Sequence, residues 1–532
     1  MIFGLLSYLL IGDVASAAVQ QYLQSMQYNG LKKPIKPVIT NLQKDVSTTK
    51  NKHKKRPLKA ASEDFSLWSN AFNFHNAWGT QVNPRTGTLS AYVKVGSLVS
   101  NWGRGPDIAL NVNYNSNSKA DPDGLGMGWS WNLTHFNPHN NQLSTSQGED
   151  FNLQQLHNGR WWPIYHKLHD IQIDGSKEKN LVITYTNGLR EILDHNGYEV
   201  RLEQQDGRGV NFYYTFGSHN LTTISDDQGH KIKLNRHVNY LTVTSSDSDG
   251  KPVDIRLNKF DGELRAITLP DNISAGPGIH FNYHNFLLEK ISYPTGLQKH
   301  ISYNCNDAMQ VILKNNRQVA ALCAVVRLTV DPGAKQPKSV IHYSYGQTSG
   351  NHHNYLAFNS GLTVLPNTMQ DALFEASGNY TYKTTEDNGL VKKIRTYNKY
   401  HLLTDTKIIS DHTGALLSEI QDFFCRTDQA DGCAETNFND LPATYSLPLK
   451  IITKNWGSGS GAPSVDIVSR TYDNRGRVIS STDAYGCREK ISYCPVAGDS
   501  ACPAEPAGWS LSSQLKSVTE YPAAKSILTS EP

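Results

Sequence analysis

The chain has 532 residues and a formal net charge of +3, with 38% apolar and 19% charged residues. Because domains usually hold about 100–200 residues, this length requires several domains or a repetitive architecture that grows by adding units. A net charge this small does not indicate a nucleic-acid partner. Tyr (26) and Gly (40) are abundant and Met (5) is scarce, which favours strands and turns over helices.

The N-terminal stretch MIFGLLSYLLIGDVASAA is typical of an export signal. Its apolar part, residues 2–12, is shorter than the roughly 20 residues that span a bilayer. Ala15-Ser16-Ala17 fits the small-x-small pattern of signal-peptide cleavage. The sequence therefore predicts a signal peptide at residues 1–17 and a secreted or cell-surface protein. No other stretch is predicted to be a transmembrane segment.

Residues 18–62 are predicted to form a flexible basic linker. Ten Lys or Arg residues lie between Leu31 and Ala60 against one acid, Asp45, and three prolines interrupt the run. Such a segment cannot bury apolar surface, so we expect it to be disordered and solvated. The alternative is that it binds anionic lipid or polysaccharide.

Residues 63–140 are predicted to form an N-terminal β region. The stretches TLSAYVKVGSLV (88–99) and DIALNVNYN (107–115) alternate apolar and polar residues, the period of a half-buried strand. In GLGMGWSWNLTHF (124–136), Trp129 and Trp131 lie two residues apart and would share one face of a strand. One interpretation is an aromatic platform for a ligand such as a sugar, joined by Trp161 and Trp162. The other is packing in the core, the more common use of large aromatic side chains.

Residues 141–486 repeat one pattern with variation. Turns such as Asp194-x-x-Gly197 and Asp226-x-x-Gly229 recur, with strand-like runs between them. A spacing of about ten residues suits short strands joined by tight reversals. A hairpin cannot bury its apolar face alone, so the repeats are expected to stack. The pattern predicts an all-β fold of stacked β-hairpins.

The clearest repeat is TYDNRGRVISSTDAYG, residues 471–486. We expect Asp to open each turn and Gly, three residues later, to leave it with positive φ. The Arg after Gly would begin the next strand with an exposed charge that blunts lateral sheet pairing. The Tyr before Asp would bury its ring and keep its hydroxyl in water. The turn residues predicted in this way are Tyr472, Asp473, Gly476, Arg477, Asp483 and Gly486.

The seven cysteines all lie in the C-terminal half of the chain, and none forms a Cys-x-x-Cys pair. This spacing argues against a zinc site or a thioredoxin-like redox pair. In an exported protein we expect local disulfides, such as Cys425–Cys433 and one pair among Cys487, Cys494 and Cys502. The odd count leaves one thiol over. Residues 487–532 are taken as a separate segment that contains Cys and Pro.

Two stretches of the sequence resemble a known family. Residues 471–486 resemble a YD repeat of the Rhs family, and residues 83–136, above all Gly105 to Trp131, resemble the start of Rhs/YD-repeat proteins of the insecticidal toxin-complex C type. The resemblance extends diffusely from Phe65 to the C-terminus. It implies a spiral β-sheet that closes as a hollow shell around a variable C-terminal toxin segment.

The sequence departs from this family after Gly486. Some shells of the family carry an aspartic self-cleavage site in a core motif near their C-terminal end, and no such motif follows here. Neither self-cleavage nor toxin activity is therefore implied. We expect the chain to form the N-terminal portion of a shell, a partial wall that needs a second shell chain or a C-terminal toxin segment encoded nearby.

No motif of catalysis is present in the sequence. It contains no G-x-S-x-G, H-E-x-x-H, P-loop or G-x-G-x-x-G pattern. We therefore predict no catalytic residues, no metal site and no cofactor. Three functions remain as hypotheses: a non-catalytic shell protein, which is favoured, an exported module that binds cell-surface carbohydrate, and a hydrolase on a β-scaffold.

Overall fold

The computed structural model describes residues 78–118, 120–156, 159–176, 180–246, 250–268, 278–305, 312–313, 317–318, 323–346, 374, 380–433, 436–456, 461–494, 502 and 514–523. The predicted signal peptide and basic linker lie outside these described residues. Within them the structure is made of strands and turns, with short 3-10 elements such as η1 (Ser100–Gly103) and η4 (Phe438–Asp440) and no α-helix. The prediction of an all-β fold is confirmed.

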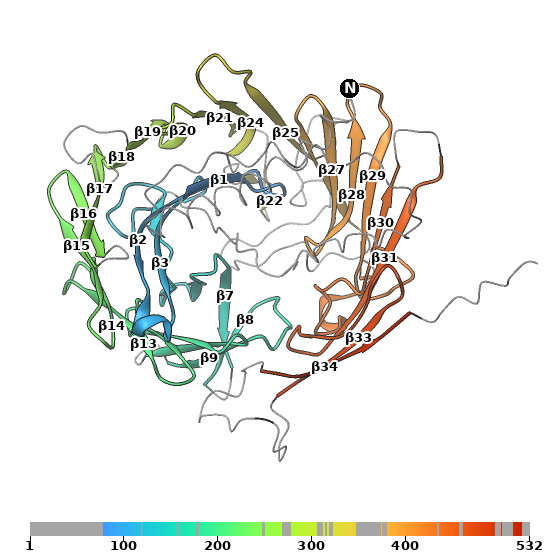
Figure 1. Ribbon diagram of the computed structural model, residues 1–532, viewed down its shortest axis with the longest axis horizontal. Helices are drawn as coiled ribbons and strands as arrows, with labels where there is room; N and C mark the ends of the chain where they lie inside the picture. The colour runs from blue at the N-terminus through green and yellow to red at the C-terminus, as the bar shows by residue number, and fades with distance from the viewer. Residues whose placement is uncertain are drawn as a thin grey trace, which may run out of the picture. The chain divides into compact units, whose positions relative to one another are not determined.

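The first strands form a four-stranded antiparallel sheet in the order β1-β2-β3-β4 (Figure 1). Its strands are β1 (Trp78–Val82), β2 (Leu89–Leu98), β3 (Ile108–Asn115) and β4 (Trp129–Trp131). Strand β3 buries every second residue, as the alternation in its sequence predicts. Strand β2 is buried on both faces along much of its length, so it lies in the interior of the fold.

The remaining strands form one long antiparallel sheet of 28 strands in chain order. Its first half comprises β5 (His135–Asn137), β6 (Gln142–Ser144), β7 (Asp150–Gln155), β8 (Trp161–Pro163), β9 (Ile171–Gly175), β10 (Leu181–Tyr185), β11 (Leu189–Leu193), β12 (Glu199–Gln204), β13 (Gly209–Tyr214), β14 (Leu221–Asp226), β15 (Lys231–Arg236), β16 (Tyr240–Ser246), β17 (Pro252–Phe260), β18 (Glu263–Thr268), β19 (Gly278–His284) and β20 (Leu287–Ser292). Its second half comprises β21 (Gln298–Asn304), β24 (Ala324–Asp331), β25 (Ser339–Tyr345), β26 (Thr381–Asp387), β27 (Val391–Asn398), β28 (Leu403–Ser410), β29 (Leu416–Phe423), β30 (Lys450–Asn455), β31 (Ser464–Tyr472), β32 (Val478–Thr482), β33 (Arg488–Tyr493) and β34 (Leu515–Tyr521). A separate hairpin of β22 (Ile312–Leu313) and β23 (Arg317–Gln318) lies between β21 and β24 in the chain.

Each strand of the long sheet pairs with its neighbours in sequence, so the sheet is a meander. In its described residues the last strand, β34, pairs only with β33, and the sheet does not close on β5. A single bridge between His135 and Tyr198 links β5 to the start of β12. The sheet also continues through β33 and β34, past Gly486, where the sequence indicated a separate segment.

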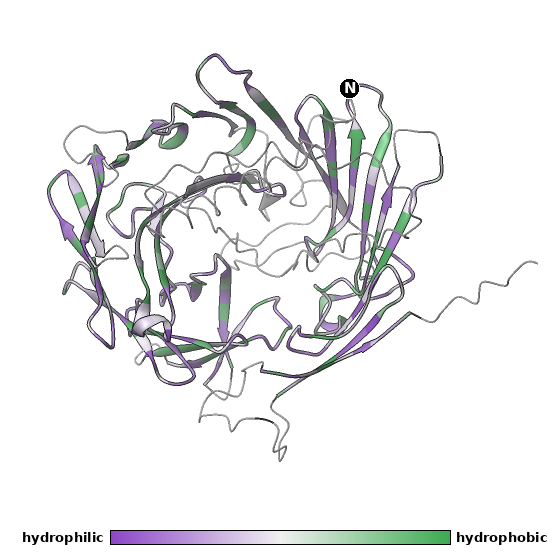
Figure 2. Cartoon of the chain, viewed as in Figure 1, coloured by the Kyte–Doolittle hydropathy of each residue, from purple (hydrophilic) through white to green (hydrophobic). Residues whose placement is uncertain are grey.

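Apolar side chains gather where the two sheets meet. The largest cluster joins residues of β2, β3 and β4, such as Leu110 and Trp129, to residues of β13 to β24, such as Ile232, Val243 and Ile279. Figure 2 shows the alternation of apolar and polar residues along these strands. The four-stranded sheet therefore buries the apolar face of this half of the meander. A second cluster fills β5 to β11.

Two loops far apart in the sequence contact each other. The ammonium group of Lys167, between β8 and β9, donates to the carbonyls of Asn439 and Leu441 (2.9 and 2.7 Å), which lie between β29 and β30. The hydroxyl of Tyr445 donates to the carbonyl of Tyr165 (2.9 Å). These contacts join the early and late parts of the meander without strand pairing.

Candidate functional site

The repeat turn at Asp473 is a four-residue reversal held by one carboxylate. The amide of Gly476 donates to the carbonyl of Asp473 (3.1 Å), whose own amide donates to the carbonyl of Arg477 (3.0 Å). The Asp473 Oδ1 accepts from the amides of Arg475 and Arg477 (2.9 and 3.0 Å). Gly476 has a φ of +79°. A residue with a Cβ pays about 1–2 kcal/mol for that conformation, so glycine is favoured there.

The same turn occurs at Asp194, Asp226 and Asp483. In each, the glycine three residues later donates its amide to the aspartate carbonyl, and the carboxylate accepts from two amides of the turn. The repeated Asp-x-x-Gly pattern is therefore a recurring hydrogen-bonded unit. Its aspartate carboxylates accept hydrogen bonds from the amides of their own turns.

Arg477 has a different position from the one expected. Its Nε donates to Asp473 Oδ2 (2.7 Å), and its guanidinium lies over the ring of Tyr493, 4.5 Å from the centroid. The side chain is 17% exposed. The expectation of an exposed charge that blunts lateral pairing is therefore wrong for Arg477, which stabilises its own turn and packs on a neighbouring strand.

Tyrosines at strand ends are bonded to the preceding hairpin. Tyr283 is paired with Leu288 beside a β-bulge, and Tyr303 with Val325 beside the next one. The hydroxyl of Tyr303 donates to the Leu288 carbonyl (2.9 Å), and that of Tyr345 donates to the Val325 carbonyl (2.8 Å). A bulge interrupts the ladder of backbone hydrogen bonds. The following tyrosine therefore supplies a donor at the interruption and ties successive hairpins together.

This tyrosine-to-bulge bond is found elsewhere in the sheet. Tyr214 donates to the carbonyl of Glu199 (2.8 Å), and Tyr493 donates to that of Val478 (3.1 Å). The hydroxyl of Tyr472 donates to the carbonyl of Pro448 (3.0 Å). The expectation that the Tyr472 hydroxyl lies in water is therefore wrong, because it is bonded to a backbone carbonyl of the loop before β30.

Replacing Tyr303 by Phe tests the contribution of this bond. We expect Tyr303→Phe to lower the free energy of unfolding by about 1–3 kcal/mol, because the carbonyl of buried Leu288 loses its donor. Tyr213 is 51% exposed, and Tyr213→Phe should change stability by less than about 0.5 kcal/mol. Chemical denaturation of the two variants measures the difference. Equal losses would contradict a specific role of the Tyr303 hydroxyl.

Three of the four tryptophans singled out in the sequence are buried. Trp129 is fully buried between Tyr114 and Phe281, with ring centroids 5.3 and 4.9 Å away, and its indole N–H donates to the Tyr283 hydroxyl (2.8 Å). Trp131 is 5% exposed. Neither ring offers a face to a ligand at the surface, so the described structure gives these residues the position that core packing predicts.

The second pair, Trp161 and Trp162, are consecutive residues of β8, so their side chains point to opposite faces of the sheet. Trp161 is 2% exposed and packs against Phe136. Trp162 is half-buried, and its indole N–H donates to the carbonyl of His166 (2.8 Å) while its ring contacts that of His169. The four rings therefore do not form one platform.

Trp102, which the sequence analysis did not single out, is the exposed tryptophan among those whose burial is described. It is 77% exposed and meets the ring of His230 edge-on at 4.5 Å. Asn101 and Trp102 have φ values of 50° and 59°, which are strained for residues other than glycine. The amide of Asn101 donates to buried Asp226 (2.7 Å), and this bond holds the strained segment in place. No pattern in the sequence predicts the positive φ values of Asn101 and Trp102.

The cysteines form local disulfides. Cys425 is bonded to Cys433, and Cys494 to Cys502. A third bond joins Cys305 to Cys323 and links the ends of β21 and β24. Cys487 is an exposed free thiol.

A group of buried polar side chains surrounds two glutamates. Glu191 accepts from the hydroxyls of Thr134, Ser146 and Tyr185 at 2.6–2.7 Å, and Glu199 accepts from the amide of Thr134 (3.0 Å). Both glutamates are 2% exposed. The cluster joins the chain before β5 to β10, β11 and β12.

Burial shifts the pKa of both glutamates. It raises the pKa of both, and the neighbouring Glu191 raises the pKa of Glu199 further. The three hydroxyl donors oppose the rise at Glu191. Paired carboxyls whose environments shift their pKa values to different extents are used in catalysis when a substrate can reach them. Both carboxyls are almost fully buried in this structure.

Three partly buried carboxyls elsewhere in the fold also have raised pKa values. Burial raises the pKa of Asp123 to about 6, and those of Glu149 and Asp422 to about 7. The amide of Trp131 donates to Asp123 (2.9 Å) and opposes the shift there. These shifts follow from burial within the sheets and their loops, and they do not converge on one centre.

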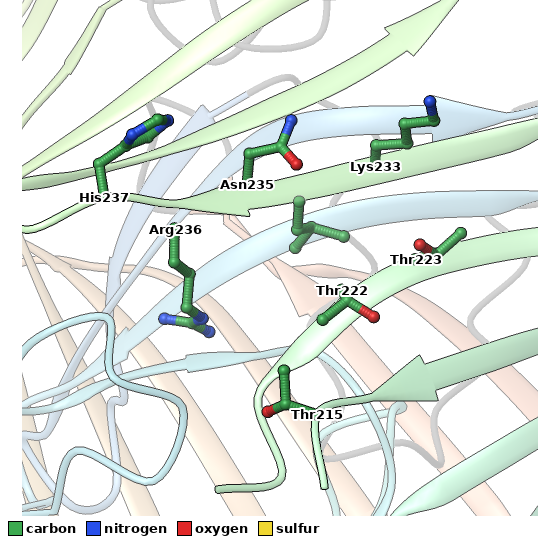
Figure 3. A pocket seen from close by; sticks show the side chains of 8 residues that line it. Thr215, Thr222, Thr223, Lys233, Asn235, Arg236 and His237 are labelled. Atoms are coloured by element: carbon green, nitrogen blue, oxygen red, sulfur yellow. The ribbon is translucent and has the colours of Figure 1, made fainter.

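A shallow hollow of about 560 Å³ lies on β14 and β15 near one end of these strands (Figure 3). In Figure 3 the side chain of Arg236 is directed away from those of Lys233 and Asn235. Arg236 donates to the carbonyl of Asp123 (2.7 Å). The lining supplies hydroxyls, one amide and cations but no carboxylate, so it offers contacts to an anion or a sugar and no acid–base pair. The lining residues are Thr215, Thr222, Thr223, Lys233, Leu234, Asn235, Arg236 and His237.

Within the described residues, no group of three or more His, Cys, Asp or Glu side chains is arranged to hold a metal ion. In the same part of the chain, no helix has both the length and the apolar character needed to cross a bilayer.

No protein-family model and no curated protein matches the chain. Among solved structures, the TcdB2–TccC3 complex is similar over 80% of this chain and 27% of that chain, at 8% identity and a TM-score of 0.14. A Tc holotoxin pore of Photorhabdus luminescens is similar over 81% and 24%, at 10% identity and a TM-score of 0.17. The chain thus spans about a quarter of the length of these proteins. Structural similarity with so low a sequence identity and TM-score does not support any conclusion about mechanism.

Proposed function

We propose that the chain is a non-catalytic wall segment of an Rhs/YD-repeat shell, exported and used in a toxin-delivery or cell-surface system. The observation that supports this proposal best is a unit found at the Asp194 and Asp473 turns: an Asp-x-x-Gly turn, a β-bulge beside it, and a tyrosine of the strand that follows, which donates to the bulge. A unit that binds its predecessor in the same way each time can extend a sheet by addition. The sequence resemblance at residues 471–486 and 105–131 points to the same class.

The interior chemistry fits a structural role. The Asp-x-x-Gly carboxylates are engaged by turn amides, and the buried Glu191–Glu199 pair is enclosed by hydroxyl and amide donors. These groups join one strand or turn to the next. The partner required by a wall segment would be a second shell chain or a toxin segment encoded nearby.

Co-expression with the neighbouring genes tests the shell proposal. We expect the chain to co-purify with a repeat-containing or toxin-like product, and that product to resist added protease while the complex is intact. Heating the complex until it unfolds should restore cleavage. Recovery of the chain without any such product, or equal cleavage of the partner with and without the chain, would contradict the proposal.

A second candidate function is binding of a surface carbohydrate, and exposed Trp102 is the observation that favours it. A tryptophan held outward on a strained segment would stack on a sugar ring. A glycan array probed with the wild type, Trp102→Ala and Phe216→Ala separates the two functions, because Phe216 is an exposed aromatic on another turn. Loss of signal in Trp102→Ala alone would support the carbohydrate module.

A further inference from the structure

Two aromatic side chains from distant parts of the sequence meet at the surface. Trp102 belongs to η1, between β2 and β3, and His230 lies directly before β15. Their ring centroids are 4.5 Å apart, and the ring planes make an angle of 89°. Trp102 is 77% exposed, and the side chain of His230 is 34% exposed. The contact with His230 therefore leaves most of the indole ring open to solvent.

One buried carboxylate oxygen positions both side chains. Asp226 Oδ2 accepts from the amide of Asn101 and from Nδ1 of His230, both at 2.7 Å. The side-chain amide of Asn101 also donates to the carbonyl of Gly209 (3.1 Å). Burial alone would raise the pKa of Asp226, but the hydrogen bonds from Asn101, His230 and the turn amides lower it below its usual value. Asp226 is therefore a carboxylate at neutral pH, and it fixes the segment that carries Trp102 against the ring of His230.

The place of His230 in its turn shows what distinguishes this pair of rings. His230 follows the glycine of the Asp226 turn, as Arg477 follows the glycine of the Asp473 turn. Both side chains bind the aspartate of their own turn. The guanidinium of Arg477 is covered by the ring of Tyr493, and its side chain is 17% exposed. His230 instead lies at the surface beside an exposed indole, a position that turn formation does not require.

The two rings offer one aromatic face and one hydrogen-bonding nitrogen. Because the Asp226 carboxylate only accepts, Nδ1 of the neutral His230 ring carries the proton and Nε2 is the acceptor. Among the described residues, none forms a hydrogen bond with Nε2. A pyranose has apolar C–H groups on its face and hydroxyls around its rim, so it suits an indole face beside an acceptor. The Asp226 side chain is 0% exposed, so no carboxylate of this pair is available to a cationic ligand.

We propose that Trp102 and His230 together bind a pyranose sugar, which stacks on the indole of Trp102 and donates a hydroxyl hydrogen bond to Nε2 of His230. This inference rests on the second candidate function, carbohydrate binding. It adds His230 as the second recognition group and Asp226 as the residue that positions both. A ligand held at two points has one orientation on the ring, so the site would reject sugars that lack the hydroxyl facing His230.

Two substitutions separate the ligand role of His230 from its role in the turn. In His230→Asn, the side-chain amide can still donate to Asp226, but no nitrogen takes the place of Nε2. We expect this variant to keep the thermal midpoint of the wild type and to bind sugar at least about tenfold more weakly. In His230→Gln, the amide reaches the position of Nε2 and the bond to Asp226 is lost. We expect a lower thermal midpoint and a dissociation constant within about threefold of the wild-type value.

The measurement uses the full chain. A glycan array identifies the glycans that the wild type binds, and calorimetric titration with one of them gives the dissociation constant of each variant. His195→Asn is the matched control, because His195 is an exposed histidine of the Asp194 turn. This control should bind the glycan as the wild type does. Trp102→Ala should lose binding.

The outcomes distinguish this inference from the function on which it rests. If the wild type binds no glycan, or if Trp102→Ala binds as the wild type does, the carbohydrate function fails and the inference fails with it. If Trp102→Ala loses binding and His230→Asn does not, the carbohydrate function stands and the role given to His230 is wrong. Binding that falls in step with the thermal midpoint in the two His230 variants, or equal weakening by His195→Asn, would also overturn that role.

Discussion

Replacing Gly197 by Ala is expected to destabilise the protein by more than about 3 kcal/mol. Gly197 has a φ of +89°, and a Cβ there would lie 1.7 Å from the carbonyl oxygen of Phe136. The backbone would have to move, which would break the bond from the Phe136 amide to the Gly197 carbonyl (2.8 Å) and the bridge between His135 and Tyr198. The expected result is a lower thermal midpoint and loss of protection at β5 in hydrogen exchange.

Gly207 provides the matched control for this prediction. It has a similar φ of +81°, but no atom lies within 4 Å of the position that a Cβ would take. Gly207→Ala should therefore cost only the conformational strain of about 1–2 kcal/mol. If Gly197→Ala and Gly207→Ala lowered the free energy of unfolding equally, the close approach of β5 to the Asp194 turn would not contribute to stability.

Replacing Glu199 by Gln is expected to stabilise the protein at neutral and alkaline pH. Burial and the neighbouring Glu191 hold the pKa of Glu199 well above its usual value in the folded chain. The amide of Gln is neutral at every pH, and its oxygen can still accept from the amide of Thr134. The variant therefore avoids ionising a buried carboxyl.

The direction of the pH effect follows from proton linkage. Below the usual glutamate pKa both the folded and the unfolded chain hold the proton, and the wild type and Glu199→Gln should be similar. As pH rises above that value, the unfolded chain releases the proton while the folded chain keeps it, so the wild type loses stability until the raised folded pKa is passed. Each pKa unit of difference corresponds to about 1.4 kcal/mol. Thermal midpoints of both proteins from about pH 4 to about pH 9 measure this growing difference.

Glu191 should respond in the opposite way. Three hydroxyls donate to its carboxylate, and an amide at this position would present an N–H group to at least one of them. Glu191→Gln should therefore lower the free energy of unfolding by about 1–3 kcal/mol at neutral pH. Equal pH profiles for the wild type and Glu199→Gln, or stabilisation by Glu191→Gln, would contradict this account of the two carboxyl environments.

The positions of strands and turns could be predicted because they depend on neighbouring residues. Alternation in residues 107–115 predicts β3, and Asp473 with Gly476 predicts a turn whose carboxylate and positive φ are local properties. The four-stranded sheet ends at Trp131 and the long sheet begins at His135. The exposed Trp102 depends on a backbone conformation without a sequence signal, so it could not be predicted.

The sequence by itself determined that the chain forms strands joined by aspartate–glycine turns, because these choices rest on bonds within a few residues. Only the tertiary structure decided which groups are enclosed and which face the solvent. It buried Trp129, brought Glu191 and Glu199 beside the Thr134 segment, and directed tyrosine hydroxyls to carbonyls 15 to 24 residues earlier. Such partners depend on the register between strands and on the packing of one sheet against the other. That information is spread over the whole chain rather than held in any short stretch of it.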